Sequence, residues 1–177
     1  SIFHKLNFTR TSGGKAWLRK FFTEPHGDLK RIMGTQKVIR SLMEHVDDWP
    51  EDISNGTLLV MDKFMDYALD PISERSNVVN GLVYKWLHSE DYSMVKYSIP
   101  HFADFFRGIR SIAMLLDDLD LPPNISIYID RIAQVLKDEP LGLLSQTEKG
   151  DKFSIRDTLY FGYYLRTKYR TKTLELI

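Results

Sequence analysis

Hydrophobic positions along this chain recur with the period of an α-helix. The pattern is clearest over 28–46, where apolar residues return every three or four positions and so share one face of a helix. Asp28 is of the type that caps a helix N-terminus, and Trp49-Pro50 ends the pattern. A helix is therefore predicted over about 28–46. Its apolar positions are Leu29, Ile32, Met33, Ile39, Met43 and Val46, with Gln36 among them.

A second helix is predicted just before it, capped by Thr11 or Ser12 and ended by Pro25 and Gly27. Because Trp17 and Phe21 lie on its apolar side, we expect both in the core, where truncation to Ala would cost roughly 3–5 kcal/mol. The same side also carries Leu18 and Phe22, and the polar side carries Lys15, Arg19 and Lys20.

Further helical patterns follow residue 50, with an exposed loop expected over 146–152 and close helix packing expected at Gly81. Ser154 with Asp157 resembles a capping box at the start of the last helix. No alternating run is long enough for a sheet. The sequence predicts an all-α protein, an irregular array of seven or eight helices in one domain over 1–177. The expected helices are 53–69 (with Leu58, Met61, Met65 and Leu69 inward), 78–87, one from Ser93 that kinks or restarts at Pro100 and runs to Leu116, one from Asn124 to Leu136 closed by Pro140, and one over 155–174.

Composition narrows the function classes. The 177 residues include no cysteine, which excludes disulfides, thiolate zinc sites and cysteine nucleophiles. The longest apolar runs are four or five residues, too short to span a membrane, and no signal peptide begins the chain. We therefore expect a cytoplasmic protein.

The 24 basic and 24 acidic residues cancel in sum but are unevenly distributed. Residues 1–40 hold nine basic and two acidic side chains, net +7. Residues 41–148 hold eight basic and nineteen acidic side chains, net −11. Residues 149–172 hold seven basic and two acidic side chains, net +5. This asymmetry indicates a polyanion or an acidic neighbour near the basic ends, at 5–20 and 166–172, and solvated helix faces are the alternative.

No catalytic, cofactor-binding or metal-binding residue is assigned from the sequence. Gly13-Gly14-Lys15 suggests a phosphate-binding loop, but Thr9 and Ala16 stand where a P-loop requires Gly and Ser or Thr. The glycines are interpreted as a tight entry into the first of the predicted helices. The acidic runs at 47–52 and 117–120 lack the EF-hand pattern and are interpreted as solvated helix ends. No two histidines have helical metal-ligand spacing; they are His4, His26, His45, His88 and His101.

A basic and aromatic stretch lies near the end of the chain. Aromatic side chains among cations suit nucleic acid, on whose bases they stack. They suit a packed helix with a basic solvent face equally well. The stretch contains Tyr160, Tyr163, Tyr164, Lys168, Tyr169, Arg170 and Lys172.

The N-terminal third carries several spaced elements in order. Residues 6–15 read LNFTRTSGGK, residues 18–28 read LRKFFTEPHGD, and residues 32–42 read IMGTQKVIRSL. This order resembles the core or lever domain, domain III, of MutS-family DNA mismatch-repair ATPases. That domain opens with an acidic residue, T-x-T and a small-Gly-basic step, then W-L-x-x-P and I-x-x-R-Q-x-x-V-x-x-L. Asn7, Phe21 and Thr35 replace the usual Asp, Trp and Arg, which indicates a divergent, MutS-like branch.

The resemblance implies a non-catalytic helical core that couples a C-terminal ATPase domain to mismatched or branched DNA. ATP and Mg²⁺ would belong to that ATPase domain, since this chain holds no Walker A motif. The parent protein would dimerise and clamp DNA, and its clamp and ATPase domains would be the neighbours of this core. No long coiled-coil arm or β-rich insert is evident, so we expect no direct DNA contact and assign no DNA-contacting residue.

The two ends of the chain favour a piece of a longer protein, because Ser1 replaces an initiator Met and Ile177 interrupts a helical pattern. The alternative is a free-standing helical module that binds a protein partner. A complete gene that ends near residue 177 would favour this alternative.

Overall fold

The computed structural model describes residues 2–24, 27–74, 77–117 and 121–170. Within these ranges the protein forms nine α-helices, one 3₁₀ turn and no strand, which confirms the all-α prediction. The elements are α1 (Ile2–Leu6), α2 (Ser12–Thr23), α3 (Leu29–Glu44), η1 (Val46–Asp48), α4 (Asn55–Asp66), α5 (Val78–Leu87), α6 (Ser89–Asp117), α7 (Pro123–Leu136), α8 (Glu139–Gln146) and α9 (Ile155–Thr167).

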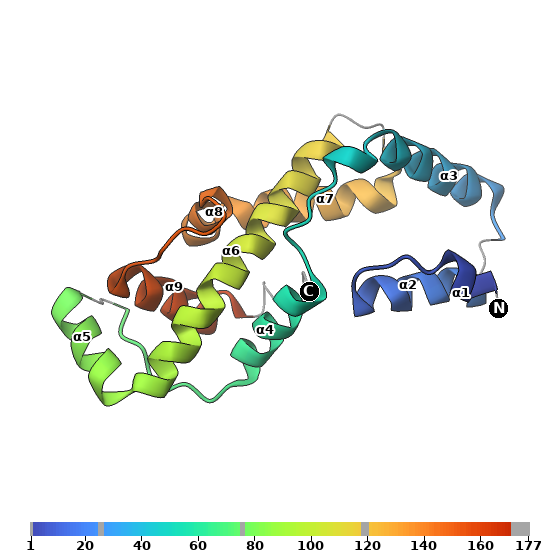
Figure 1. The fold of residues 1–177 in the computed structure, drawn as a ribbon. Coiled ribbons are helices and arrows are strands. Elements are labelled where there is room, and N and C mark those ends of the chain that lie inside the picture. Colours follow the sequence, from blue (N-terminus) through green and yellow to red (C-terminus); the bar gives the residue numbers. More distant parts are fainter. Residues whose placement is uncertain (1, 25–26, 75–76, 118–120, 171–177) are drawn as a thin grey trace.

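The long helix α6 organises the fold. It has 29 residues, about 43 Å at 1.5 Å per residue. Helices α4, α5, α7, α8 and α9 all pack against it, and it crosses the molecule from α5 at one end to α7 at the other (Figure 1). The predicted start at Ser93 and restart at Pro100 are wrong. Pro100 lies on the exposed face, where water can hydrate the carbonyl that loses its backbone partner.

The hydrophobic core lies where α6 meets α4, α8 and α9. Phe64 of α4 and Phe102 of α6 are fully buried and meet edge to face, with ring centroids 5.2 Å apart. The inward positions predicted at Met61 and Met65 are confirmed, since both side chains are buried. Other fully buried core residues are Val95, Ile99, Phe106, Leu141, Leu144 and Leu165.

Helix α8 is a core element that the sequence analysis misses. Pro140 was expected to close the preceding helix, but α7 already ends at Leu136 and Pro140 lies in the first turn of α8. Proline is tolerated there because the first backbone N–H groups of a helix have no intrahelical partner. Leu141 and Leu144 are fully buried, and the eight residues of α8 are too few to display a clear helical period.

The expectation that Trp17 and Phe21 lie in the core is wrong. Their side chains are 60% and 45% exposed, and no residue of α1 or α2 is buried. In α3 only Val38 is buried. Helical periodicity identifies an apolar face, but it does not say whether the rest of the chain covers that face.

Local capping follows the sequence closely. Thr11 and Asp28 accept hydrogen bonds from the backbone amides of Gly14 and Lys30, at 3.0 Å each. Ser154 Oγ accepts from the amide of Asp157 at 3.2 Å and donates to its Oδ2 at 2.7 Å. Helix α9 ends at Thr167, and the predicted position at Leu174 lies outside the described residues.

Candidate functional site

Three polar residues from separate segments meet beside the start of α6, and we call them the Asp70–His88–Asp91 cluster. Asp70 lies in the connection after α4, His88 is the C-terminal cap of α5, and Asp91 is in the first turn of α6. Asp70 Oδ2 lies 2.7 Å from His88 Nδ1, and Asp91 Oδ2 accepts a hydrogen bond from the Asp70 amide at 2.9 Å. Asp91 is buried, whereas Asp70 is exposed.

Two tyrosines border this cluster. Tyr84 donates its hydroxyl to the Asp70 carbonyl at 3.1 Å, and its ring stacks on His88 with centroids 4.9 Å apart. Burial, then the negative charges of Asp91 and Asp70, raise the pKa of Tyr84 to about 12. The pKa of Tyr67 is also raised, first by burial and then by Asp91.

The cluster is the one group within the described ranges with the composition of a metal site. Its three ligand atoms lie within 4.8 Å of one another, and imidazole nitrogen with carboxylate oxygens suits Zn²⁺ or Mn²⁺. Each side chain also has a protein partner, because Asp70 pairs with His88 and Asp91 binds the Asp70 amide. These hydrogen bonds hold the connection between α4 and α5 against the start of α6. His88 and Asp91 are three positions apart, but the sequence analysis misses the cluster because Asp70 lies 18 and 21 positions before them, a separation that no motif links.

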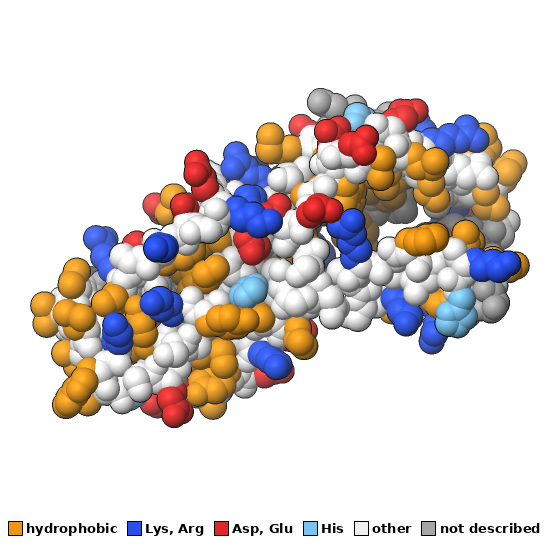
Figure 2. Space-filling view, viewed as in Figure 1, with side chains coloured by type: hydrophobic (Ala, Val, Ile, Leu, Met, Phe, Trp, Pro, Cys, Tyr) orange, Lys and Arg blue, Asp and Glu red, His pale blue; other side chains and the backbone are white. Residues whose placement is uncertain are grey.

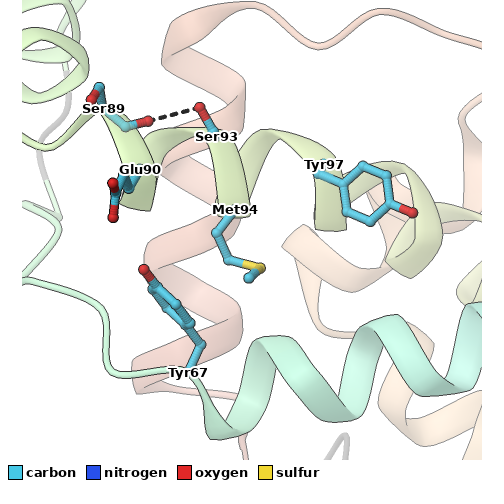
Figure 3. A pocket seen from close by; sticks show the side chains of 6 residues that line it. All are labelled: Tyr67, Ser89, Glu90, Ser93, Met94 and Tyr97. Carbon is cyan, nitrogen blue, oxygen red and sulfur yellow. Dashed lines mark hydrogen bonds between the residues drawn. The ribbon is translucent and has the colours of Figure 1, made fainter.

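An open hollow lies beside the start of α6 (Figure 3), and two of its residues, Ser89 and Glu90, separate His88 from Asp91 in the sequence. Side chains from the end of α4 and the first turns of α6 line it: Tyr67, Ser89, Glu90, Ser93, Met94 and Tyr97. Ser93 Oγ donates to the Ser89 carbonyl at 2.7 Å, so this hydroxyl serves the helix backbone. The hollow is open to solvent, whereas sites for small substrates are concave and bury most of the ligand.

Two arginines connect the long helices to distant segments. Arg107 of α6 donates through Nε to Asp52 Oδ1 and through Nη1 to the Thr147 carbonyl, both at 3.0 Å, and it also pairs with Asp104. Arg166 of α9 donates to three carbonyls at the end of α4, including Phe64 at 2.8 Å and Tyr67 at 2.7 Å. These are carbonyls that a helix C-terminus leaves without an intrahelical partner.

The acidic run at 47–52 is only partly a solvated helix end. Asp52 is largely buried against Arg107, with 18% of its side chain exposed, so the prediction is wrong for this residue. Glu51 pairs with Arg10 at 2.7 Å, although both side chains are exposed. Of the second run, residues 118–120 lie outside the described residues.

The other candidates from the sequence lie apart from the cluster. The glycines before Lys15 form the first turn of α2, with the Gly14 amide bound to Thr11, as predicted. His45, at the end of α3, lies 3.7 Å from Asp48 in an ion-pair geometry.

Tyr160, Tyr163 and Tyr164 of the aromatic and basic stretch lie in α9, and Lys168, Tyr169 and Arg170 follow its end. Tyr164 contacts the rings of Tyr160, Tyr163 and Tyr169. Lys168 lies 4.8 Å from the centroid of the Tyr164 ring and pairs with Glu74 at 3.3 Å. Arg170 is exposed, and Lys172 lies outside the described residues.

Compared with known protein families, with curated proteins and with solved structures, the chain matches none. Within the described ranges, no helix has the length and apolar character needed to cross a membrane.

Proposed function

We propose that this chain is the non-catalytic helical core of a MutS-like DNA mismatch-repair protein, coupling an ATPase domain to its grip on mismatched or branched DNA. The observation that supports this most is α6, one 29-residue helix with partners packed along its length. The family named in the proposal comes from the resemblance of the spaced sequence pattern at 6–42 to the MutS core domain.

A lever must carry a displacement from one end to the other. Arg107 and Arg166 join α6 and α9 to backbone carbonyls far away in sequence, so these helices and their connections move together. The Phe64–Phe102 contact fills the space between α4 and α6. Well-packed elements of this kind shift between discrete arrangements rather than deform gradually.

The proposal assigns the chemistry to other parts of the parent protein. ATP and Mg²⁺ bind its ATPase domain, its clamp subdomain holds DNA, and the parent works as a dimer inside the cell. The core contributes no catalytic residue of its own.

Coupling is tested in the full-length product of the gene. Lys96 and Tyr97 are exposed on α6, so they can be replaced without opening the core. Changing both to Gly softens the helix by about 1 kcal/mol per residue relative to Ala. The matched control changes both to Ala and keeps the helix stiff.

DNA-stimulated ATP hydrolysis is the readout. The Gly pair should lower stimulation several-fold and leave the basal rate unchanged, and the Ala pair should preserve both. Equal stimulation in the two variants would contradict coupling through α6. A full-length product without ATPase activity would contradict the family assignment.

A free-standing interaction module is the second candidate. The exposed apolar faces of α2, α3 and α5 favour it, since such faces mark contact surfaces. A gene that encodes little beyond these 177 residues, with partner binding and no ATPase, would establish it in place of the lever.

A further inference from the structure

Helices α2 and α3 expose a large apolar surface that the rest of the described chain does not cover. We call it the α2–α3 surface. Contiguous exposed apolar surface marks interaction sites on proteins. Figure 2 shows the molecule hollowed between these helices, with hydrophobic side chains over both. Its members are between 37% and 70% exposed: Trp17, Phe21, Leu29, Ile32, Met33, Ile39 and Met43.

The apolar stripe of α3 faces away from the body of the protein. Val38 is buried, and a Cβ built at Gly34 would lie 3.4 Å from Pro122, so this side of α3 contacts the body. At 100° per residue, Leu29 lies opposite Val38, and Ile32 and Ile39 lie about 120° and 100° from Val38, so the apolar stripe is turned away from these contacts. The helix therefore packs against the body through the side that carries Gly34 and Val38. Its apolar stripe stays exposed.

The charge on α2, α3 and their capping residues is net positive. Helix α2 carries three cations, with Glu24 at its C-terminal cap, and α3 carries four cations, with Asp28 at its N-terminal cap and Glu44 at its end, so their net charge is +4. Lys20 Nζ lies 5.5 Å from the centroid of the Trp17 ring, at the edge of the apolar surface, and also 3.8 Å from the carboxylate of Glu24, an exposed pair that a partner's carboxylate can replace. A partner must therefore bring apolar side chains surrounded by negative charge.

We propose that the α2–α3 surface binds an acidic amphipathic helix of a protein partner. Such a helix presents apolar anchors at i, i+3, i+4 and i+7 to an apolar groove, with carboxylates on its flanks facing the cations. Nucleic acid fits less well, because aliphatic side chains such as Ile39 and Met43 offer no ring on which bases stack. This inference does not depend on the proposed function, since the α2–α3 surface is present whether or not the chain couples an ATPase domain to DNA.

A designed peptide tests the chemistry. The probe is a fluorescein-labelled helical peptide with Leu along one face, Glu on both flanks and Ala elsewhere, titrated with the whole chain by fluorescence anisotropy. One control peptide has Lys in place of every Glu. The other has the same composition in an order that disperses Leu around the helix. We expect saturable binding of the Glu peptide, at least about tenfold tighter than either control.

Protein variants locate the site. Trp17→Ala and Met33→Ala should each weaken binding at least about tenfold, and Arg40→Glu should weaken it too. Trp86→Ala is the matched control, because Trp86 is 81% exposed on α5, at the far end of the molecule (Figure 1). It should leave the affinity unchanged. Far-UV circular dichroism confirms that each variant is folded.

Several results would overturn the proposal. One is that the Glu peptide shows no saturable binding, and another is that the Lys peptide binds with the same affinity. The third is that the Trp17→Ala and Trp86→Ala variants lose the same affinity for the Glu peptide. If the chain binds duplex DNA and Trp17→Ala weakens that binding, the surface would be assigned to nucleic acid instead. Self-association that Met33→Ala abolishes would assign it to a second copy of the chain.

Discussion

The contacts of Arg166 predict a large loss of stability when this side chain is removed. Its guanidinium donates to the carbonyls of Phe64, Met65 and Tyr67, and it lies 5.7 Å from the centroid of the Phe64 ring. Burial, and then the neighbouring Arg170, lower the pKa of Arg166, but an arginine remains charged at neutral pH. The charge thus complements the negative end of the α4 dipole.

Arg166→Ala should lower the free energy of unfolding by about 3 kcal/mol, counting about 1 kcal/mol net for each hydrogen bond. Arg166→Lys keeps the charge but cannot reach three carbonyls, so about 1–2 kcal/mol should be lost. With an m-value of about 2 kcal/mol/M, the urea midpoint of the Ala variant falls by about 1.5 M.

Urea unfolding followed by circular dichroism measures these midpoints. Arg156→Ala is the matched control, since Arg156 is exposed on the first turn of α9, and it should change stability by less than about 0.5 kcal/mol. An Arg166→Ala midpoint equal to that of this control would refute the account of how α9 holds α4.

Three further predictions follow from single positions. Phe102→Ala should lower the free energy of unfolding in urea by about 3–5 kcal/mol, because the ring is fully buried. Gly81→Ala should lower the melting temperature, because the added Cβ would lie 2.7 Å from Ile155 Cγ2. The control is Gly13→Ala, whose Cβ would meet no atom within 4 Å. It should leave the free energy of unfolding unchanged or raise it by up to about 1 kcal/mol. Burial raises the pKa of Tyr84 from its ordinary value of 10.0 to about 12 in the folded state, so its contribution to stability is present below pH 10 and is lost as pH rises toward 12. Tyr84→Phe should reduce that alkaline loss of stability. In a titration followed by ultraviolet absorbance, it should also remove one tyrosine ionisation near pH 12. An unchanged titration would contradict the raised pKa of Tyr84.

Much of the fold is predictable from local rules. Caps at Thr11, Asp28 and Ser154 fix helix starts because their side chains bind amides within the next three residues. The close approach at Gly81 is confirmed by its contact with Ile155. What local rules miss is the continuity of α6 through Pro100, since that depends on which face of the helix meets solvent.

Burial and the candidate site depend on contacts between distant segments. Trp17 was expected in the core and is exposed, because an amphipathic pattern does not identify its partner. The Asp70–His88 pair and the contact of Arg107 with Asp52 join residues far apart in sequence. Nothing in the spacing of these residues could reveal such pairs.

The most direct test of the central claim, that α6 is one stiff element joining the two ends of the molecule, is amide hydrogen exchange along this helix. The account predicts that amides from Val95 to Ile109 exchange only through global unfolding, at one common slow rate on both sides of Pro100. Fast exchange around Pro100, dividing α6 into two independently opening halves, would contradict it.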